Sequence, residues 1–244
     1  MTAFKSALDQ FNEESYRGSF ITTGHSKLDE LIGGGIKLGT VTEISGEAGC
    51  GKSQFCMQVA ANALARNQRV RFIDTEKGSS ISRITELFKF CSAREGWETA
   101  RNNVMFAASA TIQELQIHLQ QCLSDTENIP DLLVLDSITT PFRGSDLTEE
   151  AVELDNTAVT LCKIATMKGT AVVCTNHVTS RIDSEGNQRL DPSLGGFWSH
   201  RPTSRIWMEK IDQTRWIALE KSPYAELKQS QFNIRREGIR LIDY

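Results

Sequence analysis

The sequence predicts an α/β protein with a mainly parallel, twisted sheet flanked by helices and with antiparallel hairpins at its C-terminal end. Between residues 41 and 174, short apolar runs typical of buried strands alternate with segments of helical periodicity. This alternation requires crossover connections, which are right-handed and make neighbouring strands parallel. Beyond residue 203 the pattern changes to closely spaced strand-like runs, as expected for hairpins.

Length, composition and charge limit the class of protein. A chain of 244 residues suits one large α/β domain, and 39% hydrophobic with 24% charged residues is typical of globular proteins. The apolar runs are too short to cross a bilayer and the N-terminus lacks a signal-peptide core, so we expect an intracellular protein without a membrane partner. The six scattered cysteines favour buried free thiols over disulfides or a zinc site. A net charge of −4 means that any contact with nucleic acid is local or completed by a partner.

Capping residues, hydrophobic periodicity and β-branched content predict the helices and strands along the chain. Before the first strand, Ser26 and Asp29 resemble a capping box that begins a short helix. The expected parallel strands are Val41–Ser45, Val70–Asp74, Val104–Ala107, Leu132–Leu135 and Thr170–Cys174. The expected helices run from Gln54 to about Leu64, about Ile81 to Cys91, Ile112 to Leu123, and about Ala151 to Met167. The expected C-terminal strands are Ser204–Glu209, Arg215–Glu220, Gln231–Ile234 and Ile239–Ile242.

A glycine-rich loop between the first of these strands and the next helix carries the strongest chemical signal. Residues 46–53 match G-x-x-x-x-G-K-[ST], the phosphate-binding loop of nucleotide hydrolases. The glycines let the backbone turn several N–H groups inward at phosphate oxygens, and the helix N-terminus adds partial positive charge. Lys52 reaches the β- and γ-phosphates, and the Ser53 hydroxyl ligates Mg²⁺. We therefore predict a nucleoside triphosphate site formed by Gly46, Glu47, Ala48, Gly49, Cys50, Gly51, Lys52, Ser53 and Gln54.

Polar residues at the C-terminal ends of the strands are the other candidates, because ligands of open α/β sheets lie there. Asp136 ends an apolar strand and is expected to support Mg²⁺ through water; the alternative is an aspartate that caps a turn. Glu76 is the candidate general base for water attack on the γ-phosphate, or else a solvated loop residue. His177 either senses the γ-phosphate by a hydrogen bond or is a strand-end histidine with ordinary partners.

The segment after His177 is a weaker candidate for a nucleic-acid contact. A polar loop from Thr179 to about Pro192 contains Arg181 and Arg189, but its acidic residues offset their charge. Next, Phe197 and Trp198 precede Arg201, an arrangement that suits base stacking with phosphate contact or, equally, packing of the aromatic rings in the core.

Taken together, these motifs resemble the RecA/RadA recombinase core from about Phe20 to Leu241, and within that family the eukaryotic recombinase paralogues, most nearly the C-type paralogue. The stretches that carry the resemblance are Ile21–Gly24, Gly46–Gln58, Phe72–Glu76, Leu132–Ser137, Pro141–Arg143, Thr175–Val178, Pro192–Gly195 and Lys221–Pro223. The resemblance implies a RecA-type P-loop ATPase core over residues 21–244, preceded by a tail over residues 1–20.

The resemblance also implies roles for individual residues. Glu76 takes the place of the catalytic glutamate, working with Lys52, and Arg83 that of an arginine that stacks on adenine. Residues 141–150, with Arg143, and residues 179–194 take the places of two DNA-binding loops. Phe4 and Ala7 resemble an F-x-x-A hook that packs one recombinase subunit into the next, and Lys221 with Pro223 lies where the family caps a neighbour's ATP.

Several departures from the family pattern change the expected function. The family's N-terminal helical domain does not appear in this sequence, His177 replaces the usual glutamine, and Lys77 replaces a glycine. The resemblance then implies a slow, DNA-stimulated ATPase that uses ATP and Mg²⁺ as an accessory mediator of homologous recombination. Its expected partners are the main recombinase, a second paralogue or small accessory protein, and single-stranded DNA, in the nucleus with the cytoplasm as an alternative. The rival hypothesis is a non-catalytic scaffold that keeps ATP as a structural ligand.

Overall fold

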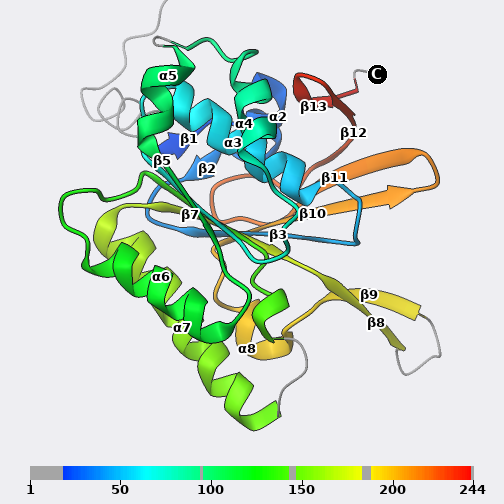
Figure 1. Ribbon diagram of the computed structural model, residues 1–244. Coiled ribbons are helices and arrows are strands. Elements are labelled where there is room, and N and C mark those ends of the chain that lie inside the picture. Colours follow the sequence, from blue (N-terminus) through cyan, green and yellow to red (C-terminus); the bar gives the residue numbers. More distant parts are fainter. Residues whose placement is uncertain (1–18, 94–95, 143–146, 183–187, 243–244) are drawn as a thin grey trace, which may run out of the picture.

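In the computed structural model, one nine-stranded sheet runs through the molecule, with helices packed on both faces (Figure 1). The structure describes residues 19–93, 96–142, 147–182 and 188–242, and for residues 147–150, 181–182, 188–189 and 196–197 the backbone alone. The strand order is β13-β12-β11-β10-β3-β7-β6-β4-β5, and the strands from β10 to β5 are parallel. The predicted α/β architecture is therefore confirmed.

The parallel half of the sheet follows the predicted alternation of strands and helices. Its strands are β3 (Val41–Gly46), β4 (Val70–Asp74), β5 (Val104–Ala108), β6 (Leu132–Asp136) and β7 (Ala171–Asn176). The helices between them are α3 (Lys52–Ala65), α4 (Ile81–Phe88), α5 (Trp97–Ala100), α6 (Ile112–Ser124) and α7 (Leu147–Lys168), with 3-10 turns η1 (Arg101–Asn103) and η2 (Thr140–Phe142). Helix α3 begins two residues before the predicted start, because the phosphate loop leads into it directly. The periodicity of α7 begins in a polar stretch, which hid its first turn from the sequence pattern.

Each central strand supplies side chains to two separate hydrophobic layers. Along β6, Leu132 and Val134 face the layer beneath α3 and α4, while Leu133 and Leu135 face the layer beneath α6 and α7. All five residues of β6 and all six of β7 are buried, which explains their continuous apolar sequence. Figure 1 shows α6 and α7 on the face of the sheet opposite to α3 and α4. No helix among the described residues has the length and apolar character needed to span a membrane.

The antiparallel half consists of β10 (Ser204–Ile211), β11 (Thr214–Lys221), β12 (Gln229–Arg235) and β13 (Gly238–Leu241). These four strands confirm the predicted hairpins, and β10 joins them to the parallel half by pairing with β3. The predicted polar loop after His177 is instead an antiparallel pair, β8 (Val178–Ile182) and β9 (Gln188–Pro192), which projects from the sheet and is called the ribbon below (Figure 1). The sequence missed it because both strands are polar, so no alternation marks a buried face. Helix α8 (Gly195–Ser199) follows the ribbon.

A small N-terminal unit packs beside α3. It consists of β1 (Phe20–Ile21), α2 (Ser26–Leu31) and β2 (Ile36–Lys37). The predicted capping box at Ser26 is wrong: His25 is the N-cap, and Asp29 instead accepts hydrogen bonds from Thr22 and from the Thr23 N–H. The Asp29 carboxylate therefore fixes the turn before the helix rather than the helix N-terminus.

Candidate nucleotide-binding site

The phosphate loop is held against the sheet at one end and open at the other. At Gly46, whose φ is 157°, a Cβ would lie 2.0 Å from the Met208 carbonyl oxygen, so the loop begins in direct contact with β10. At Gly49, φ is 78° and a Cβ would meet no atom within 4 Å. Because residues 47–49 are exposed, the middle of the loop presents backbone to open space. That shape suits the close approach of a phosphate chain.

Lys52 already points into the concave side of this loop. Its ammonium is buried with the residue at 7% exposure and donates to the carbonyl oxygens of Gly46 at 2.8 Å and Glu47 at 2.9 Å. Backbone carbonyls are neutral acceptors, and no carboxylate within the described part of the chain forms an ion pair with this buried ammonium. A triphosphate fits this arrangement, since its oxygens would supply the missing negative charge at the same position.

Asp136 lies at the end of β6, directly beside Asp74 at the end of β4. Its carboxylate is 2% exposed and accepts hydrogen bonds from the hydroxyls of Ser79 at 2.9 Å and Thr175 at 2.5 Å. Burial raises the pKa of the Cys56 thiol on α3; the Asp136 charge raises it further and the Lys52 charge opposes the rise. Lys52 stands at the start of α3, after β3, and Asp136 at the end of β6, so both lie at the edge of the sheet where a Mg²⁺ site made from Ser53 and Asp136 would form. Carboxylate, hydroxyl and phosphate oxygens are the donors that Mg²⁺ prefers.

Glu76 follows β4 and is fixed by three side chains. Its Oε1 atom contacts His177 Nε2 and accepts from the Ser137 hydroxyl at 2.5 Å and the Thr140 hydroxyl at 3.1 Å. The hydrogen bond from His177 is the largest cause that lowers the pKa of Glu76 to about 2; Ser137 and Thr140 act in the same direction, and partial burial opposes them. The carboxylate is therefore ionised at neutral pH and suited to orienting a water molecule. It is a weak proton acceptor.

Arg83 lies on the first turn of α4, next to the start of α3. Its Nε donates to Gln54 Oε1 at 3.0 Å, and its Nη atoms donate to the carbonyl oxygens of Arg235 and Arg236. Its Nη1 atom also forms an ion pair with Glu86 Oε2 at 2.5 Å. The guanidinium plane is thus held between the phosphate-loop helix and the β12–β13 turn. Stacking on adenine stays a prediction.

The candidate DNA and partner residues fall in different parts of the chain. Phe4, Ala7 and Arg143 lie outside the described residues, and for Arg181 and Arg189 the structure gives the backbone only, paired across the ribbon. Arg201 forms an ion pair with Asp155 of α7. Trp198 is 1% exposed and packs in the layer beneath α7, so of its two alternatives core packing is confirmed and base stacking is wrong. Lys221 ends β11 beside an exposed Pro223, and partial burial, followed by the Arg205 charge, lowers the pKa of Lys221.

Sequence reasoning missed the side chains that position these groups. Ser79, Ser137, Thr140 and Thr175 hold Asp136 and Glu76, and the available signal was their place within five residues of a strand end. It also missed Glu43, a carboxylate at 0% exposure in the middle of β3. A charged residue inside a strand that is otherwise suited to burial was the signal for it.

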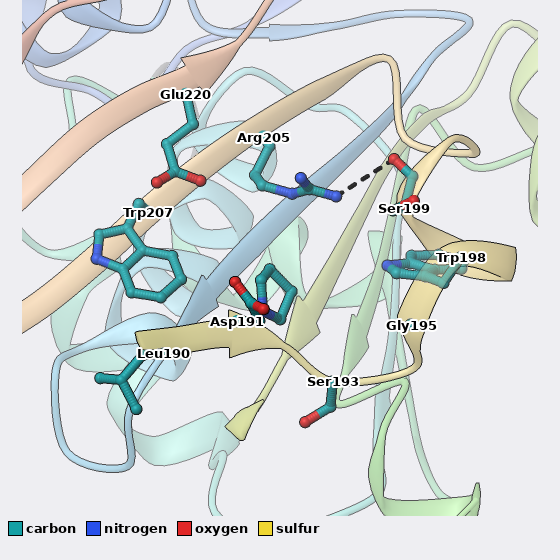
Figure 2. Close-up of a pocket in the computed structure, with 10 residues that line it drawn as sticks. Leu190, Asp191, Ser193, Gly195, Trp198, Ser199, Arg205, Trp207 and Glu220 are labelled. Atoms are coloured by element: carbon teal, nitrogen blue, oxygen red, sulfur yellow. Dashed lines mark hydrogen bonds between the residues drawn. The ribbon is translucent and has the colours of Figure 1, made fainter. Parts of the chain in front are cut away.

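Beside the ribbon, a pocket of about 380 Å³ opens between β9, α8 and the strands β10 and β11. Figure 2 shows Arg205 at its centre, with Trp207 and Glu220 on one side and Trp198 and Ser199 on the other. Asp191 and Leu190 of the ribbon form its opposite wall. The pocket is separate from the phosphate loop, none of whose residues line it.

Comparison with known proteins shows the family of this chain. The family model Rad51 matches residues 18–242. The chain belongs to the Rad51 family. Similar relatives include "DNA repair protein RAD51 homolog 4" of Mus musculus, 30% identical over 234 positions that cover 88% of this chain and 70% of the mouse protein. "DNA repair protein RAD51 homolog 3" of Cricetulus griseus is 29% identical over 263 positions, covering 96% of this chain and 71% of the relative.

A third relative, "DNA repair protein RAD51 homolog 4" of Bos taurus, is 30% identical over 233 positions, covering 88% and 71% of the two chains. The chain is thus similar to two different RAD51 homologs at nearly equal identity. The predicted membership among eukaryotic recombinase paralogues of the RecA/Rad51 type is confirmed by the family model and these relatives together. These matches do not single out one paralogue.

Proposed function

We propose that this protein is an ATP-binding recombinase paralogue that acts as an accessory mediator in homologous recombination and DNA repair. It would stabilise or remodel recombinase filaments on single-stranded DNA, together with the main recombinase and a second paralogue or small accessory partner. Its place of action would be the nucleus. The relatives named as DNA repair proteins support the process, and the site supports the nucleotide.

The observation that carries the proposal is the state of Lys52. Its buried ammonium is aimed at the concave side of the phosphate loop and is satisfied there by two neutral carbonyls. Asp136 and Glu76 stand at neighbouring strand ends, one set to support a metal through water and the other to hold a water. These are the parts that nucleoside triphosphate hydrolysis needs.

The chain's own residues would divide the work as follows. Gly46 to Gln54, with Arg83 beside Gln54, would bind the nucleotide, and Ser53 with Asp136 would hold Mg²⁺, which supplies charge neutralisation at the phosphates when bound. Glu76 would orient the attacking water from a position fixed by Ser137 and Thr140. His177 contacts the Glu76 carboxylate, so a change at Glu76 would be transmitted through His177 to the adjoining ribbon.

A second candidate is a scaffold in which ATP is a structural ligand. It is favoured by the crowding at Glu76, whose pKa of about 2 makes it a weak base and whose Oε1 atom has three partners. In that case the nucleotide would stabilise the fold, and turnover would have no consequence for repair.

A complementation assay with Lys52→Arg separates the two. The variant keeps a cation in the loop but changes its geometry, which blocks productive phosphate contact. The mediator proposal predicts that a well-folded Lys52→Arg protein fails to restore recombination to cells that lack the chain. Full restoration by a variant with no measurable turnover would reject the ATPase and favour the scaffold.

A second experiment tests the predicted assembly hook. Phe4→Glu places a charge in a motif expected to insert an aromatic ring into an apolar pocket of the next subunit. We expect it to reduce binding to the main recombinase at least about tenfold, as loss of an aromatic anchor does. Phe11→Glu, in the same tail but outside the motif, is the matched control and is expected to bind normally.

A further inference from the structure

The buried carboxylate of Glu43 joins the phosphate-loop strand to the base of the ribbon. Its Oε1 atom accepts hydrogen bonds from Asn176 Nδ2 at 2.7 Å and Trp198 Nε1 at 2.8 Å. Its Oε2 atom accepts from Arg205 Nε at 2.6 Å. Glu43 thus contacts the residue before His177, the helix that follows the ribbon, and strand β10.

The partners of Glu43 are themselves bonded to the base of the ribbon. Asn176 donates a second hydrogen bond to the Ser193 carbonyl at 3.0 Å, and the Ser193 N–H donates to the His177 carbonyl at 2.8 Å. Arg205 donates to the Ser199 carbonyl of α8 at 3.3 Å (Figure 2). Both the entry and the exit of the ribbon are therefore held by one network, which we call the Glu43 hub: Glu43, Asn176, Trp198 and Arg205.

A pocket limits the packing of β9 against the neighbouring strands. The pocket of about 380 Å³ lies between β9 and the strands β10 and β11, and Arg205 and Trp198 form part of its wall. A space of this size removes the close contacts through which packed interiors transmit displacement. The polar hub is then a side-chain link between the ribbon base and β3, in addition to the backbone pairing of β7 with β3.

The same strand ends in the phosphate loop. Glu43 precedes Gly46 by three positions, and β3 pairs with β7 and β10 on its two sides in a continuous register. A shift of the loop on nucleotide binding therefore acts on both strands that hold the hub. A buried charge pair with good geometry has few alternative arrangements, because separating it leaves an uncompensated charge.

We propose that Glu43 is a positioning residue that couples the phosphate loop to the ribbon. The proposal deepens the function proposed above, since it rests on nucleotide binding at Lys52. Nucleotide bound at the loop changes the exposure of the β8 and β9 backbone chiefly through the Glu43 hub.

Hydrogen exchange of the β8 and β9 amides in the full-length chain, with and without ATP and Mg²⁺, tests this coupling. We expect ATP to change wild-type exchange in these strands at least about fivefold, the lower end of usual coupling strengths. Glu43→Met combined with Arg205→Met removes both charges without leaving one unpaired. In that variant the change is expected to fall below about twofold, while the Kd for a fluorescent ATP analogue stays within about threefold of wild type.

Two further variants complete the test: one serves if the double variant does not fold, and the other is a control. Trp198→Phe removes one hydrogen-bond donor from the hub and keeps an aromatic ring in the core, so it decides the matter if the double variant does not fold. We expect it to reduce the ATP-dependent change in exchange by about half or more on a logarithmic scale. Asp125→Asn, which breaks the Arg71–Asp125 pair of the same 2.6 Å length away from the hub, is expected to behave as wild type.

The outcomes are distinguishable. A wild-type chain that fails to bind the ATP analogue rejects the nucleotide site itself. Binding by wild type with no change in β8 and β9 rejects the coupling. Binding with a change that persists in a folded double variant, or in Trp198→Phe, rejects the role of Glu43 and leaves the nucleotide site in place.

Discussion

His177 Nε2 contacts Glu76 Oε1 and thereby joins the end of β7 to the loop after β4, across the candidate catalytic edge of the sheet. His177 is therefore both the partner of the candidate water-orienting carboxylate and the residue directly before the ribbon. It also lowers the pKa of Glu76 more than any other interaction does.

Replacing His177 tests whether this contact matters for turnover. His177→Gln keeps a hydrogen-bond donor of similar reach, and His177→Ala removes it. We expect single-stranded DNA to stimulate ATP hydrolysis by wild type and by His177→Gln, and the stimulation to fall about tenfold or more in His177→Ala. Equal stimulation in all three proteins would show that the contact has no part in coupling.

The hydrogen bonds to Glu76 predict a pH dependence of stability. A carboxyl group whose pKa is lowered in the folded state stabilises the fold above its unfolded pKa, and this contribution is lost as the pH falls through the folded pKa. For Glu76 the window runs from about pH 5 down to about 2. Urea unfolding at pH 7 and pH 3 should show that wild type loses more stability on acidification than Glu76→Gln. Equal losses would contradict the strong hydrogen bonding described here.

Two glycines of the phosphate loop predict losses of stability of different size for the same substitution. Gly49→Ala meets open space and costs about 1 kcal/mol for its left-handed backbone. Gly46→Ala drives a Cβ into the Met208 carbonyl and should cost at least about 3 kcal/mol. Urea unfolding measures both, and a fluorescent nucleotide measures binding by the folded Gly49→Ala protein, which we expect to weaken. Similar stability of the two variants would be inconsistent with the contact of the loop with β10.

Two arginines separated by four positions in the sequence should differ sharply in their effect on stability. The Arg201–Asp155 pair is 37% and 43% exposed, so Arg201→Ala should cost less than about 1 kcal/mol. Arg205→Ala leaves the buried Glu43 carboxylate without its cation and should cost about 3 to 5 kcal/mol. Thermal or urea unfolding compares them, and a small effect of Arg205→Ala would contradict the importance of the buried Arg205–Glu43 pair.

The parts of the fold that depend on local spacing were predictable. The phosphate loop at residues 46–53, the buried strands and the strand-end positions of Glu76 and Asp136 follow from motif spacing and hydrophobic periodicity alone. The C-terminal hairpins were predictable for the same reason, because their alternating residues face one packed layer.

The parts of the fold that depend on contacts between residues far apart in the sequence were not predictable. None of the ribbon residues whose side chains are described is buried, so no apolar face marks its strands. The buried Trp198 donates its hydrogen bond to Glu43, 155 positions away in sequence. Glu43 has no flanking motif that reveals its three partners. Periodicity describes one element at a time, so a network shared by β3, β7, α8 and β10 does not appear in it.

We expect this chain of the Rad51 family to have a working nucleotide cycle. The most direct measurement is ATP hydrolysis by the full-length protein, purified with its cellular partners, with and without single-stranded DNA. We expect DNA-stimulated turnover that falls about 10²- to 10⁴-fold in Glu76→Gln, with nucleotide binding retained. Turnover that is absent in wild type, or unchanged in Glu76→Gln, would contradict it, and recovery of the recombinase in an inactive complex would favour the scaffold.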